Sequence, residues 1–82
     1  MNQTTKDLKT ELEKSAATLR TLRDEVRVQI HLGGLDVKDA WRKLEPRLET
    51  ALGRAATEVS DASRTAITEV TASLRNIRES LR

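Results

Sequence analysis

The chain has 82 residues, no cysteine, a single aromatic side chain and a net charge of +2. A chain this short forms one domain at most, and without cysteine it has neither disulfides nor thiolate metal sites. No stretch approaches the roughly 18 uninterrupted apolar residues that a membrane-spanning helix needs, and the N-terminus lacks the apolar core of a signal peptide. We therefore expect one cytoplasmic domain, residues 1–82, that is neither secreted nor integral to a membrane.

The composition favours helices. Ala, Glu, Lys, Leu and Arg supply about half of the residues, as is typical of long helices and coiled coils. Acidic and basic side chains are interleaved along the chain, with no basic block. Nucleic-acid binders usually concentrate Lys and Arg on one face and often add stacking aromatics. The sequence therefore predicts an all-α protein and disfavours nucleic acid as a partner.

The first predicted helix covers about residues 4–32. No Pro or Gly interrupts the chain before Gly33, and apolar residues recur at spacings of three and four, which places them on one helical stripe. The larger members of this stripe are Leu8, Leu12, Leu19, Leu22, Val26 and Ile30.

A turn at residues 33–35 follows. We expect Gly33 or Gly34 to adopt the left-handed conformation that closes a helix, and Asp36 to cap the next helix. Such a short connection favours two antiparallel neighbouring helices. His31 falls in the last turn of the first helix, where the helix dipole favours a partly protonated imidazole. Because the chain has no second His and no Cys, we do not predict a metal site.

The second predicted helix covers about residues 36–81. Trp41 lies on the apolar stripe near the turn, so we expect it in the core, facing Val26 and Leu22. Pro46 removes one backbone hydrogen bond and should kink the helix. The apolar residues nevertheless keep the same face on both sides of Pro46, which favours one bent, continuous helix over two separate ones.

Unequal helix lengths give the oligomer prediction. When the two helices are paired across the turn, the start of the first helix lies opposite Ser63 of the second helix. The part of the second helix beyond Ser63 would therefore project without a partner helix. Its large apolar residues would be bare in a monomer, at a cost on the order of 10 kcal/mol. The sequence thus predicts an antiparallel helical hairpin, with a short first helix and a long kinked second helix, that assembles into an oligomeric coiled-coil bundle. The predicted oligomer interface is Ile67, Val70, Leu74, Ile77 and Leu81.

Three functional hypotheses differ in what buries this apolar stripe. The first is a non-enzymatic structural protein that forms a dimer or higher homo-oligomer. The second is a peripheral coat on a lipid or granule surface. Residues 56–82 have a polar face rich in Thr and Ser and an eleven-residue apolar spacing, and this pattern resembles the amphipathic repeats of lipid-droplet proteins, apolipoproteins and polymer-granule phasins. The third is an adaptor that binds another helical protein. Catalysis is disfavoured because the acids fall opposite the apolar stripe, and no cofactor is predicted.

Overall fold

The computed structural model of the chain describes residues 2–81, with side-chain surroundings from residue 7 onward. Within this range the chain forms three α-helices and no strand: α1 (Asn2–Gln29), α2 (Leu35–Thr57) and α3 (Asp61–Ser80). A short 3₁₀ helix, η1 (Ile30–Leu32), tightens the end of α1. The predicted all-α class is confirmed.

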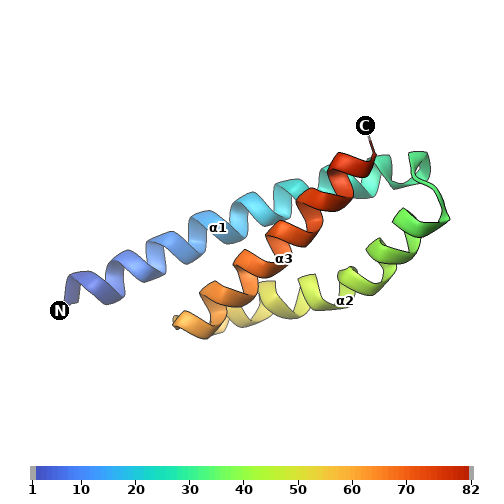
Figure 1. The fold of residues 1–82 in the computed structure, drawn as a ribbon. Coiled ribbons are helices and arrows are strands. Elements are labelled where there is room, and N and C mark those ends of the chain that lie inside the picture. The colour runs from blue at the N-terminus through green and yellow to red at the C-terminus, as the bar shows by residue number, and fades with distance from the viewer. Residues whose placement is uncertain (1, 82) are drawn as a thin grey trace.

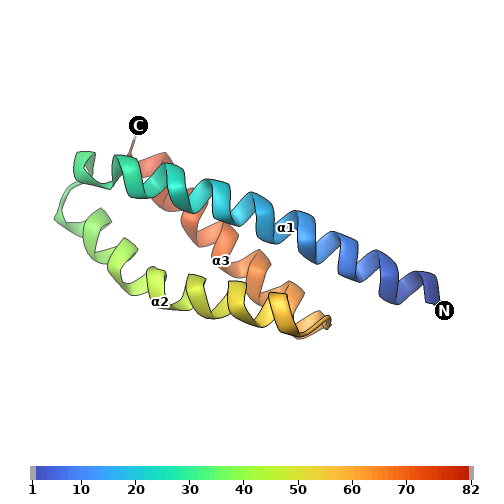
Figure 2. The same ribbon diagram turned by 180° about the vertical axis from the view of Figure 1, so that it is seen from behind.

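The three helices run up, down and up to form an elongated bundle (Figures 1 and 2). Its principal extents are 48 × 18 × 15 Å. α3 packs more extensively on α2 and on α1 than these two pack on each other. At 1.5 Å per residue α1 is about 42 Å long and α3 about 30 Å, and the N-terminal end of α1 extends past the turn that joins α2 to α3 (Figure 1).

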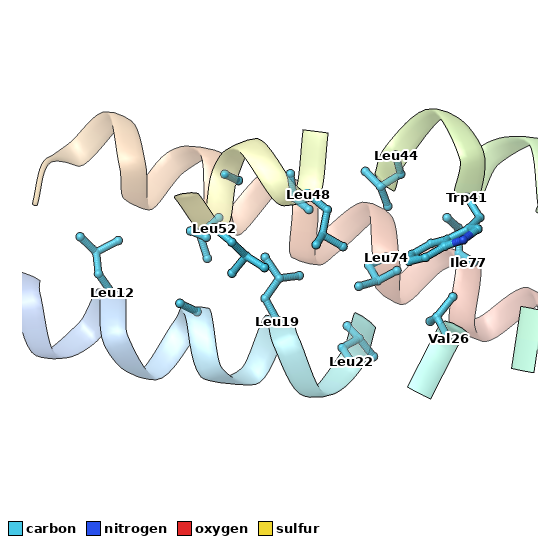
Figure 3. Packing of buried hydrophobic residues seen from close by; sticks show 14 of the residues in the cluster. Leu12, Leu19, Leu22, Val26, Trp41, Leu44, Leu48, Leu52, Leu74 and Ile77 are labelled. Atoms are coloured by element: carbon cyan, nitrogen blue, oxygen red, sulfur yellow. The ribbon is translucent and has the colours of Figure 1, made fainter. Parts of the chain in front are cut away.

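One hydrophobic core runs along the three-helix seam, and each helix contributes an apolar stripe at spacings of three and four. Near the closed end, Leu74 and Ile77 of α3 gather with Trp41 of α2 and Val26 of α1 (Figure 3). The buried apolar residues are Leu12, Ala16, Leu19, Leu22, Val26, Trp41, Leu44, Leu48, Ala51, Leu52, Ile67, Val70, Leu74, Ile77 and Leu81.

The predicted continuous helix over residues 36–81 is wrong. α2 ends at Thr57, and Glu58 is extended, with φ −132° and ψ 116°. Ser60 is the N-cap of α3, and its hydroxyl accepts a hydrogen bond from the backbone N–H of Ser63. The chain reverses here because folding back buries the apolar stripe of α3 inside the same molecule, whereas a continuous helix would leave that stripe in water.

The expected bare surface at the end of the chain is therefore also wrong for the folded monomer. Its five members are buried against α1 and α2 within one chain, with exposed fractions of 0% at Leu74 and 9% at Leu81 as the extremes. Because α3 folds back onto α1 and α2, its own apolar stripe is buried within one chain. The five residues are Ile67, Val70, Leu74, Ile77 and Leu81.

The turn between α1 and α2 falls at Gly33 and Gly34, while Leu35, predicted to lie in the turn, already belongs to α2, and the geometry of the turn also differs. Neither glycine has a positive φ: Gly33 has φ −82° and ψ 157°, and Gly34 has φ −74° and ψ 179°. The helix closes instead through η1, with the Gly33 N–H donating to the Ile30 carbonyl. Gly34, not Asp36, is the N-cap of α2, and Asp36 lies in its first turn. An acidic residue there still complements the helix dipole.

Gly33 is required for a different reason, which is close packing. A Cβ at this position would lie 2.9 Å from Leu81 Cδ2 and 3.0 Å from Val37 Cγ1. The glycine thus lets the end of α3 approach the start of α2. At Gly34, by contrast, a Cβ would have no atom within 4 Å apart from those of its chain neighbours.

Trp41 and Pro46 lie in the first half of α2. Trp41 is buried, which is the position that its spacing predicts. α2 runs through Pro46 without a break. The kink at Pro46 stays a prediction.

Candidate interaction surfaces

Carboxylates at the α1–α2 seam pair with arginines. Arg27 Nη2 lies 3.2 Å from Glu45 Oε2 and 3.4 Å from Glu49 Oε1, and Arg23 Nη1 lies 3.2 Å from Glu49 Oε1. The pairs are partly solvent-exposed, so each contributes little to stability. They restrain how α2 lies along α1, and the acids are engaged in structure.

Two further pairs join α1 to α3. Arg64 Nη1 lies 3.6 Å from Glu11 Oε1, and Arg78 Nη1 lies 3.6 Å from Glu25 Oε2. These pairs lie at opposite ends of α3. They therefore mark the register in which α3 lies along α1.

The part of the chain that the structure describes gives little support for metal binding or for acid–base catalysis. No group of three or more His, Cys, Asp or Glu residues there is placed to hold a metal ion. His31 is exposed in η1, at the end of α1. A hollow between α2 and α3 is open to solvent, and its lining includes Pro46, Ala51, Ala66, Val70, Arg47, Arg54 and Glu69.

A small polar network holds the turn between α2 and α3. The Ser60 hydroxyl donates to Glu58 Oε2 at 2.7 Å, and the Ser63 hydroxyl donates to the same oxygen at 3.3 Å. The Ser60 hydroxyl, together with Arg54 and Ser63, lowers the pKa of the Glu58 carboxyl, although partial desolvation opposes this. The ionised glutamate and the N-cap serine thus favour the folded-back turn.

The predicted oligomer interface does not form an open surface, because α1 and α2 cover it. Periodicity alone missed the turn at Glu58–Ser60, since Val59 continues the apolar row across it. The local signal was present in the sequence: a Ser–Asp pair, Ser60 and Asp61, is a helix start. Gly53, four residues before the end of α2, lowers helix propensity nearby.

Three large apolar side chains near the α1–α2 corner are exposed. Val28 is 72% exposed, Leu32 64% and Leu35 85%. They lie within eight residues of one another around the Gly33–Gly34 turn. Val59, which is 41% exposed, lies at the other end of α2.

Comparisons with known proteins place the chain in no family. No family model matches it, and neither the curated proteins nor the solved structures contain a match. Among the described residues, no helix combines the length and the apolarity that crossing a bilayer takes. The surfaces and turns of the chain itself are therefore the basis for inferring its function.

Proposed function

We propose that this chain is a non-enzymatic structural protein that associates with further copies of itself through the apolar face of α3. The observation that carries the proposal is the phase of the apolar residues across the α2–α3 turn. At 100° per residue, the buried apolar residues of α2 and α3 would all lie within about 160° of the surface of one continuous helix. These residues are Trp41, Leu44, Leu48, Ala51, Leu52, Ile67, Val70, Leu74, Ile77 and Leu81.

Two separate helices of a bundle have no need to share this phase. Each must only turn its own apolar stripe toward the core, and the non-helical backbone at Glu58 and Ser60 does not hold them in the phase of one continuous helix. A shared phase means that the same stripe can be buried in two ways, by folding back on one chain or by packing against another. The first is favoured in dilute solution and the second by mass action as the protein concentration rises.

The surface chemistry supports a binding role without catalysis. Four glutamates, Glu11, Glu25, Glu45 and Glu49, pair with arginines of a neighbouring helix. Catalytic acids need a partly dry pocket and a shifted pKa. These carboxylates are about half exposed, and their contacts serve helix packing.

Sedimentation velocity over a wide range of protein concentrations tests this proposal. The protein should be monomeric and helical when dilute and should form a discrete dimer or higher homo-oligomer when concentrated. Refolding from denaturant at high concentration removes any kinetic barrier to helix exchange. A monomer at every concentration, including after such refolding, contradicts self-association.

A second candidate is an adaptor that binds another helical protein at the α1–α2 corner. Its support is the exposed apolar surface of Val28, Leu32 and Leu35, since exposed apolar patches commonly mark protein interfaces. A Leu32→Ser, Leu35→Ser variant should keep the fold, because both side chains are largely in water. If that variant self-associates as wild type does, while a protein that copurifies with wild type is lost, the adaptor is favoured for that surface.

A further inference from the structure

The turn Glu58–Ser60 joins two helices that can become one. The turn has three residues, and its backbone leaves helical geometry at Glu58 (φ −132°) and Ser60 (φ −152°, ψ 164°). If these residues become helical, α2 and α3 form one helix over residues 35–80, about 69 Å long at 1.5 Å per residue. In that form α3 can no longer cover the α1–α2 groove of its own chain.

We propose, on the basis of the proposed self-association, that two copies of this chain exchange α3 by opening at Glu58–Ser60. The α3 helix of each copy then occupies the α1–α2 groove of the other. The fit of this occupant is seen within the monomer, where α3 buries Leu74 completely against α1 and α2. The exchanged dimer therefore repeats contacts that already exist and needs new ones only at the hinge.

The residues around the hinge suit a crossing of two helices. Val59 is 41% exposed in the monomer, although it falls near the centre of the apolar face of the continuous helix. On either side of it, Ala55 and Ala66 are only partly buried against the core. Small side chains let two helices approach closely. Where the two long helices cross, Val59 of each copy becomes buried against the other.

Local hydrogen bonds decide between the two forms. The monomer keeps the Ser60 cap and its bond to Glu58, while the straight helix gives these up and gains regular backbone hydrogen bonds. Removing the cap weakens the turn and leaves the α3 contacts intact. Removal should therefore shift the balance toward the exchanged dimer.

Hinge variants test the exchange in both directions. Val59→Pro favours an extended preceding residue, as Glu58 already is, and disfavours a continuous helix through the hinge by about 100-fold per chain. This variant should stay folded and monomeric at concentrations where wild type dimerises. Ser60→Ala should increase the dimerisation constant about fivefold per chain, and so about 25-fold overall.

Single-cysteine variants report the path of α3 directly, because the chain has no cysteine of its own. Glu25 and Arg78 approach to 3.6 Å within one chain. If Glu25→Cys and Arg78→Cys proteins are mixed and refolded together, exchange places the two thiols at facing positions on α1 and α3 of different chains, within reach of a short thiol-specific cross-linker. The cross-linked heterodimer should then exceed the statistical yield. Asp24→Cys is the matched control, since its side chain is 65% exposed and pairs with Arg23.

The outcomes separate the two proposals. A wild-type dimer that persists in Val59→Pro, or a cross-linked heterodimer no more abundant than with Asp24→Cys, overturns exchange and leaves self-association standing. A wild type that stays monomeric while Ser60→Ala forms the cross-linked heterodimer supports the exchange geometry and overturns self-association as the function. Absence of both the wild-type dimer and the cross-linked heterodimer overturns both.

Discussion

Adding one methyl group at Gly33 tests the packing of the closed end of the bundle. The backbone of Gly33, with φ −82° and ψ 157°, is one that alanine adopts without strain. Any cost of Gly33→Ala therefore comes from contacts. A Cβ there would lie 2.9 Å from Leu81 Cδ2, 3.0 Å from Val37 Cγ1 and 3.1 Å from Val37 Cβ.

Leu81 and Val37 differ in how easily they can move away from an added methyl group at residue 33. Leu81 Cδ2 is at the free end of a side chain near the end of the chain and can rotate away. Val37 is β-branched and fixed by α2, so its Cβ moves only with the helix. Overpacking costs typically 1–3 kcal/mol, and the lower chain entropy of unfolded alanine returns about 0.4–1 kcal/mol. We expect Gly33→Ala to lower the free energy of unfolding by about 1 kcal/mol.

The other two glycines are controls with different expected signs. Gly53 lies inside α2, and outside the local helix backbone a Cβ there would have no atom within 4 Å, so Gly53→Ala should stabilise the protein by about 0.5–1 kcal/mol. At Gly34 the entropic gain is offset because alanine is a poorer N-cap than glycine, and the net effect should lie within about 0.5 kcal/mol.

Urea and thermal unfolding followed by circular dichroism measure these differences. Gly33→Ala and Gly53→Ala should differ in Tm by roughly 6–16 °C, since 1 kcal/mol shifts the Tm of a domain this size by about 4–8 °C. In a Val37→Ala background the cost of Gly33→Ala should fall by at least about 0.5 kcal/mol. Equal stabilisation by alanine at Gly33 and Gly53 would refute the close approach of α3 to the α1–α2 turn.

Three further predictions concern the core and the α2–α3 turn. Leu74→Ala should cost about 2.5–5 kcal/mol at a protein concentration where the chain is monomeric, because Leu74 is 0% exposed, whereas Leu35→Ala, at 85% exposed, should change stability by less than about 0.5 kcal/mol; denaturant unfolding distinguishes the two. Ser60→Ala should lower monomer stability by about 1 kcal/mol through loss of the N-cap, measured in the same way. The folded pKa of Glu58 lies below the unfolded value of about 4.3, so its stabilising contribution is present above that pH and is lost as pH falls through the folded pKa. The stability difference between wild type and Glu58→Gln should therefore shrink below about pH 4, and a constant difference would contradict this.

Hydrophobic periodicity was sufficient for the helices and most of the core. Leu12, Leu19 and Val26 were placed on one stripe by spacing alone, and all three are buried. This works because each helix must bury one face, and the residues of one helical face recur at spacings of three and four. The same reasoning placed Trp41 correctly, since it depends only on position within one helix.

The predictions of a left-handed glycine and of an N-cap at Asp36 were wrong, because the sequence pattern does not determine the geometry of this turn. A Gly-Gly pair permits several turns, and the one adopted depends on Val37 and Leu81 packing against Gly33 from other helices. Leu81 is 48 residues away in sequence, so no local signal reports its contact. The residue types at the corner indicated that the chain turns there, but the contacts between helices determined how.

The missed turn at Glu58–Ser60 shows where periodicity fails for a physical reason. An apolar row reports which face of a helix is buried and carries no information about whether the helix ends, so a row that stays in phase hides a reversal. Only the capping signal of Ser60 and Asp61 marks the break, and it is worth about 1 kcal/mol, against the several buried side chains that either form satisfies. In the proposed exchanged pair the core contacts would repeat those of the monomer, so the choice between the two forms would depend on this small local term, on the contacts at the hinge and on protein concentration.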